Sequence, residues 1–161
     1  MIIRKEEKKD LDEIRHINDI CFNGDYESKL IDNLRKGSNF LLSLVAEDNG
    51  KIIGHIMYSR IKIGDIDSAA LAPMCVVPEC QKTGIGTELI KESIRYLKEM
   101  KEKSIVVLGH TAFYSRLGFE KAADYKVKCP FDVPEEVFMV LELEKGSIRG
   151  GMVEYGKEFS M

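Results

Sequence analysis

The sequence lacks several features that mark particular classes of protein. None of its apolar runs is long enough to cross a bilayer. The N-terminal stretch, Met1–Glu6, does not have the charged-then-apolar order of a signal peptide. Basic residues are not in excess, because 24 Lys and Arg stand against 27 Asp and Glu and give a net charge of −3. Nucleic-acid-binding proteins are more often basic. We therefore expect a cytoplasmic protein that binds neither membranes nor nucleic acids.

Paired cysteines and clustered metal ligands are also lacking. The four cysteines are scattered and form no CxxC pair, and the three histidines do not lie near them at metal-ligand spacing. The pattern does not fit a disulfide framework, so we expect reduced thiols that are buried or partly exposed. For the same reason we predict that the protein holds no metal ion.

The residues that are present predict one domain spanning 1–161, with a core at about 1–143 and a glycine-rich tail at 144–161. Asp10 is the expected N-cap of a first helix, and Gly37 is expected to end a second. Periodicity and turn signals predict the other elements: strands at 2–4, 40–47, 52–63, 66–77, 105–108, 119–120 and 137–143, and helices at 84–102 and 111–117. This order is typical of a mixed α/β sheet covered by helices.

The turn at Gln81-Lys82-Thr83-Gly84-Ile85-Gly86-Thr87 is the first candidate for chemistry. It joins an apolar strand to the longest predicted helix, so its glycines leave backbone N–H groups bare at the positive end of a helix dipole. The Lys-Ser/Thr pair of a Walker A loop is missing after Gly86, and a dinucleotide fingerprint needs a third glycine. The turn predicts a phosphate site, with a tight turn of no further function as the alternative.

A second segment helps to decide between a phosphate site and a plain tight turn. Gln81-x-x-Gly84-x-Gly86, taken together with Tyr114-x-Arg116-x-Gly118-Phe119, resembles the GNAT superfamily of N-acetyltransferases. Within that superfamily the chain is most similar to the YhbS-like predicted acetyltransferases, over nearly its whole length to about Leu143. The supporting strings are Gly54-His55-Ile56, Leu71-Ala72-Pro73, Pro78-Glu79, Leu108-Gly109-His110 and Cys129-Pro130-Phe131-Asp132-Val133-Pro134.

The resemblance implies a fold and a cofactor. The fold is a mixed, mostly antiparallel central sheet flanked by helices, with a cofactor slot between splayed strands. The cofactor is acetyl-CoA, a co-substrate. A bulge at Pro73 would open the slot toward 105–108. Backbone groups of Met74, Cys75 and Val76 would pair with the pantetheine arm. The pyrophosphate would lie on the turn formed by Gln81, Lys82, Thr83, Gly84, Ile85, Gly86 and Thr87.

The resemblance also implies that Tyr114 is the general acid that protonates the leaving CoA thiolate. The general base is not assigned, because the strand at 105–108 carries no carboxylate and Gly109-His110 stands where an asparagine is common in the superfamily. His55, His110, Glu79 and ordered water are the candidates. For His110 we favour capping or packing of the short helix, and we expect His55 to be a satisfied histidine in the core or on the surface.

The expected reaction is transfer of an acetyl group to a primary amine by direct attack in a ternary complex. A covalent route through Cys75 or Cys80 is the less favoured alternative, because no histidine base lies near either in sequence. We expect the acceptor to be a small-molecule or peptide amine. The resemblance implies that residues 10–36 and 129–136 shape its binding site. Asp25, Glu27 and Asp132 are expected to be ordinary surface charges, although they would favour a cationic amine.

Two other functions remain open from the sequence. One is a CoA-binding regulatory or interaction domain without catalysis. This alternative stays open because the strand at 105–108 has no carboxylate. The other is transfer of a different acyl group, or transfer to a hydroxyl, on the same scaffold. The oligomeric state is not predicted, since no exposed apolar stripe stands out.

Overall fold

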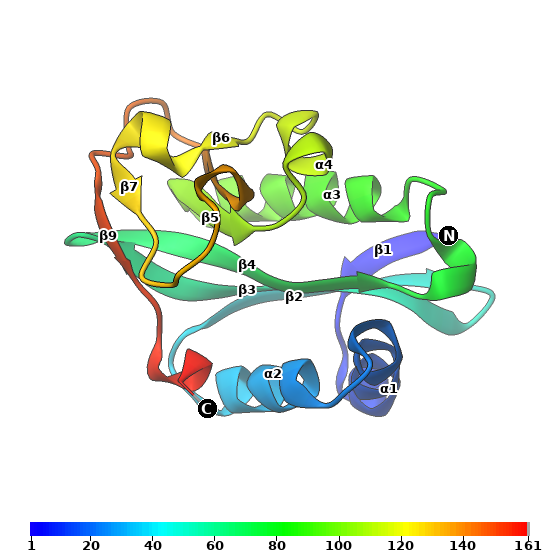
Figure 1. Cartoon of the computed structure of the whole chain (residues 1–161). Coiled ribbons are helices and arrows are strands. Elements are labelled where there is room, and N and C mark those ends of the chain that lie inside the picture. The colour runs from blue at the N-terminus through cyan, green and yellow to red at the C-terminus, as the bar shows by residue number, and fades with distance from the viewer. Residues whose placement is uncertain (161) are drawn as a thin grey trace.

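A computed structural model describes residues 1–160 of the protein (Figure 1). Its helices are α1 (Leu11–Phe22), α2 (Tyr26–Lys36), α3 (Ile85–Glu99) and α4 (Thr111–Ser115). Its strands are β1 (Ile2–Lys5), β2 (Phe40–Asp48), β3 (Lys51–Ile63), β4 (Ile66–Val76), β5 (Ser104–Leu108), β6 (Glu120–Lys121), β7 (Val127–Lys128), β8 (Phe138–Glu142) and β9 (Gly151–Glu154). Short 3₁₀ turns link several of them, among them Lys8–Asp10, Pro78–Cys80 and Lys157–Phe159.

The strands form one mixed sheet in the order β1-β2-β3-β4-β5-β8-β6. Every pair along this path is antiparallel except β4 and β5, which run parallel. The β2–β3 hairpin is closed by Asn49 and Gly50, whose φ angles of 51° and 77° are those that a type I′ turn requires. The predicted mixed, mostly antiparallel sheet is confirmed.

Helices cover both faces of the sheet, with α3 on one side and α1 and α2 on the other (Figure 1). Alternation along β2 supplies both cores, because successive side chains of a strand point to opposite faces. Leu44 packs in the cluster that contains Leu89 of α3, and Val45 packs in the cluster that contains Ile14 of α1. The face of α3 that packs on the sheet carries Ile85, Leu89, Ile90 and Leu97.

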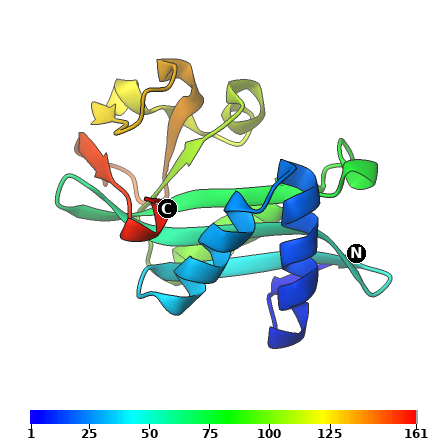
Figure 2. The same ribbon diagram turned by 60° about the horizontal axis from the view of Figure 1, so that its bottom comes forward.

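Strand β4 carries the predicted bulge. Between the pairs Ile56–Met74 and Tyr58–Leu71, β3 has one residue and β4 has two, Ala72 and Pro73. Pairing of β4 with β5 stops at Ala70 and Val106. Beyond that point the two strands part, and Figure 2 shows β5 rising away from the plane of β2, β3 and β4. The splayed-strand slot predicted from the sequence is confirmed.

The tail contains structure that the sequence analysis did not predict. Strand β9 pairs with β3 through Val153 and with β7 through Gly151. Glu158, which is buried, accepts a hydrogen bond from Asn39 Nδ2 at 3.0 Å. These contacts return the chain to the region where β4 and β5 separate.

Asp10 stands at the N-cap position of α1, as predicted. The Asp10 side chain makes no capping bond to α1. It accepts instead from the Glu7 backbone N–H at 2.7 Å and from Arg4 Nη1 at 2.7 Å. The Asp10 carboxylate therefore binds the Arg4 guanidinium and the backbone before the 3₁₀ turn, rather than the N–H groups of α1. Among residues 1–160, no helix is both long enough and apolar enough to cross a membrane.

Candidate active site

The glycine turn presents a row of unpaired backbone donors. Gly84 precedes α3 with a φ of 89°, and Lys82 also has a positive φ, of 62°. Within residues 1–160, none of the N–H groups of residues 82–87 donates a hydrogen bond, and the first bond of the helix runs from Glu88 to the Gly84 carbonyl at 3.0 Å. Six donors at a helix N-terminus form a site for an anion.

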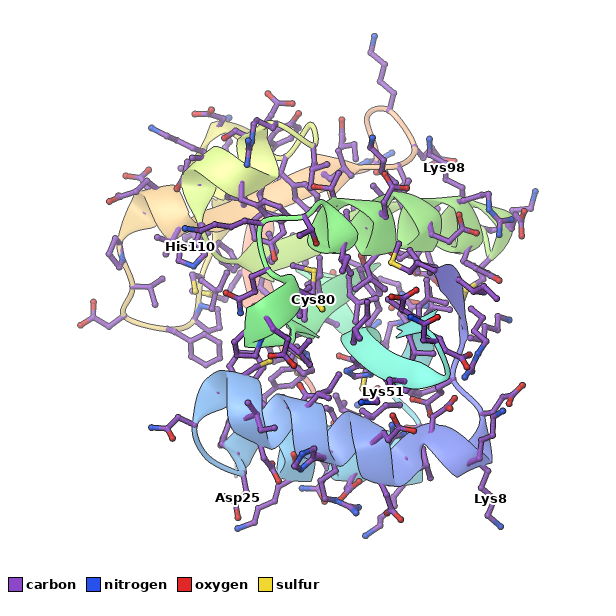
Figure 3. All side chains as sticks on the ribbon, turned by 90° about the vertical axis from the view of Figure 1, so that its right-hand side faces the viewer. Lys8, Asp25, Lys51, Cys80, Lys98 and His110 are labelled. Carbon is purple, nitrogen blue, oxygen red and sulfur yellow. The ribbon has the colours of Figure 1, made fainter. Side chains whose placement is uncertain are left out.

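A cavity of about 760 Å³ lies against this turn, and we call it the glycine-turn cavity. It is found on the side of the molecule that faces the viewer in Figure 3, where Cys80 marks the segment before the turn. Nine of the ten cofactor residues expected from the sequence line it: Met74, Cys75, Val76, Gln81, Lys82, Gly84, Ile85, Gly86 and Thr87. Thr83 is not on its wall, and its hydroxyl donates to the Cys80 carbonyl instead.

The charge of the glycine-turn cavity is positive. Lys82 and Arg116 line it, and no Asp or Glu does. The Gln81 side chain donates from Nε2 to the Val76 carbonyl at 3.0 Å, so it ties the turn to the end of β4. The cavity is therefore suited to an elongated, negatively charged ligand whose phosphates lie at the helix end.

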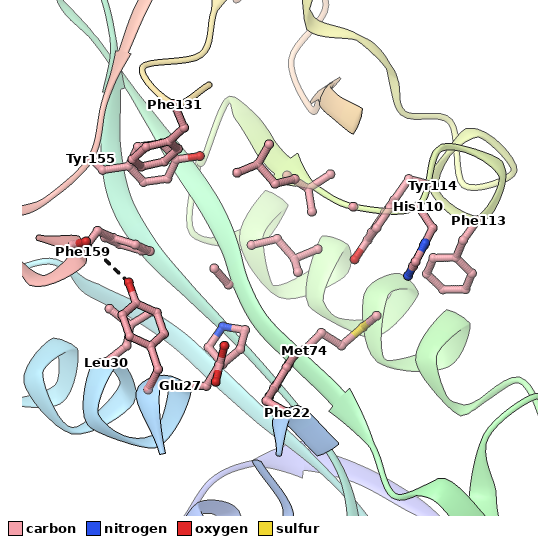
Figure 4. A pocket seen from close by; sticks show the side chains of 17 residues that line it. Phe22, Glu27, Leu30, Met74, His110, Phe113, Tyr114, Phe131, Tyr155 and Phe159 are labelled. Carbon is pink, nitrogen blue, oxygen red and sulfur yellow. Dashed lines mark hydrogen bonds between the residues drawn. The ribbon is translucent and has the colours of Figure 1, made fainter. Parts of the chain in front are cut away.

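A second cavity, of about 470 Å³, lies where β4 and β5 have separated, and we call it the aromatic cavity (Figure 4). Four residues, Phe22, Met74, His110 and Phe113, line both cavities, so the two adjoin. Side chains from α1, α2, α4 and the tail meet there. Its aromatic residues are Phe22, Tyr26, Phe113, Tyr114, Phe131, Tyr155 and Phe159.

Tyr114, the expected general acid, lies on the wall of the aromatic cavity next to the junction. Its ring is held edge-on by Phe113 and Phe119, with ring centroids 5.1 and 5.3 Å away. A Cβ at Gly109 would stand 2.3 Å from the Tyr114 ring, so only glycine leaves room for it. Burial raises the pKa of Tyr114 to about 12, which keeps the phenol protonated at neutral pH.

His110 lies at the junction, beside Tyr114 in Figure 4. We favoured capping or packing for this residue, and the side-chain cap is not made, because the His110 backbone carbonyl, rather than the imidazole, accepts the N–H groups of Phe113 and Tyr114. The imidazole makes no hydrogen bond within residues 1–160. It is exposed and borders both cavities, so it is free to meet a ligand.

The other two base candidates lie away from both cavities. His55 is fully buried between β2 and α1, where Nδ1 accepts from Asn18 Nδ2 at 3.2 Å and Nε2 donates to Ser43 Oγ at 2.9 Å. Burial, together with the smaller effect of the nearby Arg35 charge, lowers the pKa of His55 to about 3. Glu79 is exposed in the 3₁₀ turn before the glycine turn and lines neither cavity.

The thiols near the site have structural partners. Cys21 Sγ donates to the Val76 carbonyl at 3.3 Å. Contact with the Cys21 thiol and burial together raise the pKa of Cys75 far above its usual range, so Cys75 is a thiol rather than a thiolate. Residues 1–160 contain no group of three or more Asp, Glu, His and Cys side chains placed to hold a metal ion.

Of the three acidic residues singled out in the sequence, only Glu27 lines a cavity. Asp25 pairs with Lys29 at 3.2 Å on the surface, and Asp132 lies outside both cavities. Glu27 is half-buried on the wall of the aromatic cavity, and it has no hydrogen bond or ion pair among the described residues. The site thus combines a positive cavity, a junction with a phenol and an imidazole, and an aromatic cavity with one carboxylate.

These features define an acyltransferase built on an α/β sheet, and comparison with known proteins places the chain in a family. Residues 11–119 match the model of the acetyltransferase (GNAT) family. The chain therefore belongs to that family, and it is an N-acetyltransferase. The comparisons favour an enzyme over the binding module without catalysis that the sequence left open.

Similar proteins match nearly the whole chain. The uncharacterised N-acetyltransferase YhbS of Escherichia coli is 33% identical over 165 residues, which cover 99% of each protein. A crystal structure of that protein with CoA has a TM-score of 0.94 over 99% of this chain and 92% of that one. A GNAT acetyltransferase of Brucella melitensis, solved with acetyl-CoA, is 31% identical, with a TM-score of 0.83 over 98% of this chain and 97% of that one.

Several residues of the site were missed by the sequence analysis. Tyr155 and Phe159 reach the aromatic cavity from the tail, which carried no element signal strong enough to predict β9. Phe22 was hidden in the first helix as an ordinary apolar residue. Arg116 was visible within the Tyr114 segment, but it had no assigned role. Only the tertiary fold brings these side chains to one place.

Proposed function

We propose that the protein transfers an acetyl group from acetyl-CoA to a primary amine by direct attack in a ternary complex, and that the whole chain, tail included, acts as one catalytic domain. The observation that carries this proposal is the row of free N–H donors at residues 82–87, beside a cavity with Lys82 and Arg116 and no carboxylate. Acetyl-CoA is the donor, with its pyrophosphate on these donors and its pantetheine arm along Met74, Cys75 and Val76 of β4.

The junction of the two cavities is where the acetyl group meets the amine. The amine nitrogen attacks the thioester carbonyl, the C–N bond forms, and the C–S bond then breaks. The released CoA thiolate takes a proton from the Tyr114 phenol, which is protonated at neutral pH. The phenol recovers its proton from solvent. An ammonium and acetyl-CoA therefore give an amide, CoA thiol and one proton.

His110 is the base that this arrangement supports best. The incoming ammonium loses a proton before attack, and the amide nitrogen loses a second as the intermediate collapses. The His110 imidazole borders both cavities and has no partner within the described residues, whereas His55 and Glu79 border neither. Water reaches the junction beside it, because His110 is exposed.

Direct attack is favoured over an acyl-enzyme. A covalent route needs a thiolate near the thioester, and burial keeps Cys75 in its thiol form. Cys80 lines the glycine-turn cavity, but it is not among the residues that line both cavities at the junction. Within residues 1–160, no hydrogen bond joins the thiol of Cys75 or Cys80 to a histidine side chain that could act as its base.

Replacement of Tyr114 by phenylalanine tests the proposed acid. We expect Tyr114→Phe to keep the acetyl-CoA affinity of the wild type and to lower turnover roughly a hundredfold or more, which is the range for loss of a positioned acid. Turnover is measured by thiol release with an amine that the wild type acetylates. Tyr96→Phe is the control, because it removes a phenol of α3 that lines neither cavity. Unchanged turnover in Tyr114→Phe would remove this role.

A further inference from the structure

The aromatic cavity is lined by one carboxylate, and no residue among 1–160 pairs with it. Glu27 is the only Asp or Glu on its wall, and no Lys or Arg lines it. The carboxylate is half-buried and has no partner among residues 1–160. Figure 4 shows Glu27 near the bottom of the view, below the Phe131–Tyr155 pair and to the lower left of Tyr114. An unpaired carboxylate in an apolar cavity attracts a cation.

The end of the cavity away from Tyr114 is a continuous aromatic surface. Phe131 and Tyr155 lie with ring centroids 5.1 Å apart, and Tyr155 and Phe159 are 4.9 Å apart. The Tyr26 hydroxyl donates to the Phe159 carbonyl at 3.5 Å, the dashed line in Figure 4, and so joins α2 to the tail. Ring faces of this kind bind apolar and aromatic groups, and their electron-rich surfaces also tolerate a nearby cation.

The rim of the cavity leaves three large aromatic side chains open to water. Phe22 is 39% exposed, Tyr26 46% and Phe131 43%. Exposed apolar side chains that are grouped around a concave site are typical of a surface that binds a ligand. The volume of about 470 Å³ is that of a site for a small molecule. A cavity of this size has room for one ring and a short chain.

We propose that the acceptor is an amphipathic monoamine, with its ammonium group drawn to Glu27 and an aromatic or bulky apolar body against Phe131, Tyr155 and Phe159. This inference rests on the proposed acetyl transfer and names its substrate class. A polyamine or an aminoglycoside carries several charges that the cavity leaves without partners. An amino acid places a second carboxylate beside Glu27, which repels it. A peptide is disfavoured by its size, because a cavity of about 470 Å³ has room for one ring and a short chain.

An acceptor panel tests the substrate class. Phenethylamine, ethylamine, spermidine, phenylalanine and a short peptide with a free N-terminus are compared by kcat/KM at saturating acetyl-CoA. We expect phenethylamine to exceed ethylamine roughly tenfold or more, since its ring adds a large buried apolar area. It should also exceed phenylalanine and spermidine. A higher kcat/KM for spermidine or the peptide overturns the inference, and so does failure to acetylate phenethylamine by a protein that binds acetyl-CoA.

Two variants test the residues. Glu27→Gln should raise the KM for phenethylamine roughly tenfold to a hundredfold with little change in acetyl-CoA affinity, because it removes only the carboxylate charge. Asp132→Asn, in the neighbouring loop but on neither cavity wall, is the matched control. Phe131→Ala should lower kcat/KM for phenethylamine by a larger factor than it lowers kcat/KM for ethylamine. Equal effects of Glu27→Gln and Asp132→Asn would overturn the role of Glu27.

The inference and the proposed function fail in different ways. Absence of acetyl-CoA binding in the wild type would overturn the proposed function. Acetyl-CoA binding with another order of acceptors would overturn only the substrate class. Acetyl-CoA-induced thermal stabilisation of each variant, measured beside its kinetics, separates a lost acceptor contact from a lost fold.

Discussion

Single residues of this protein fit their places because of their immediate neighbours. Gly109 gives the Tyr114 ring the space it needs, since any Cβ there would collide with the ring. Tyr114 is proposed as the general acid because its flanking residues resemble those of the family. The sequence did not decide which residue is the general base, because the position of His110 relative to the cavities depends on the fold. Glu27 looked like an ordinary surface charge, and its burial and lack of a partner appear only when α2 is packed.

His55 illustrates a residue whose environment the sequence did not specify. It was one of several base candidates, and the structure puts it in a buried chain of polar groups. The Ser43 hydroxyl that accepts from His55 Nε2 also bonds to Glu6, which accepts from Arg35 Nη2 at 2.8 Å. The neutral imidazole satisfies this chain with one donor and one acceptor nitrogen. A structural role follows from this arrangement.

The pH dependence of stability tests that role of His55. Its pKa is about 3 in the folded protein, whereas an unfolded chain binds the proton below about pH 6.5. The unfolded state therefore binds more protons between these values, and the free energy of unfolding falls as pH drops, by up to about 1.4 kcal/mol per pH unit. The stabilisation is fully present above about pH 6.5 and is lost toward pH 3.

The measurement is chemical denaturation between pH 7.5 and 4.5 of wild type, His55→Gln and His16→Gln. His16 is exposed on α1, so its variant controls for loss of a histidine as such. We expect His55→Gln to be less stable than the wild type at pH 7.5. Its free energy of unfolding should also fall less steeply as the pH drops, by the slope that the uptake of one proton contributes. Identical slopes for wild type and His55→Gln would contradict the burial argument.

At the scale of elements, the sequence was informative wherever local chemistry decides the backbone. Pro73 marked the bulge in β4, and the periodicity of residues 84–102 marked the helix α3. Strand β9 was missed because its four residues, Gly151–Glu154, carry little apolar alternation. Their pairing with β3 and β7 comes from tertiary contacts that no local pattern reveals.

The glycine turn provides the prediction at this scale. Gly84→Ala and Gly50→Ala both place a Cβ at a positive φ, of 89° and 77°, and neither Cβ meets an atom within 4 Å. Both should therefore lose a similar stability, roughly 1–2 kcal/mol. Only Gly84→Ala disturbs the N–H groups at the start of α3. We expect it to weaken acetyl-CoA binding roughly tenfold, about 1.4 kcal/mol, in calorimetric titration.

The Gly50→Ala variant separates backbone strain from loss of the phosphate site, because the hairpin tip lies outside both cavities. It should bind acetyl-CoA like the wild type while unfolding at the lower temperature expected from strain. Equal acetyl-CoA affinities in the two variants would show that the start of α3 does not hold the cofactor.

At the scale of the whole molecule, the two cavities carry opposite charges on either side of one junction. Lys82 and Arg116 line the cavity suited to phosphates, and Glu27 lines the cavity suited to an amine. The bulge in β4 makes both possible, because it ends the pairing with β5 and opens the sheet between them. The net charge of −3 revealed nothing of this division, since charges scattered along the sequence separate only in the folded protein.

The most direct test of acetyl-CoA binding is thermal unfolding of the wild type with acetyl-CoA, with AMP as the control ligand. At a hundredfold excess over Kd, binding should add about 2.7 kcal/mol to the free energy of unfolding. For a chain of this length that corresponds to a rise in Tm of roughly 5–10 °C. AMP, which lacks the pyrophosphate and the pantetheine arm, should give little shift. No shift with millimolar acetyl-CoA would contradict the account.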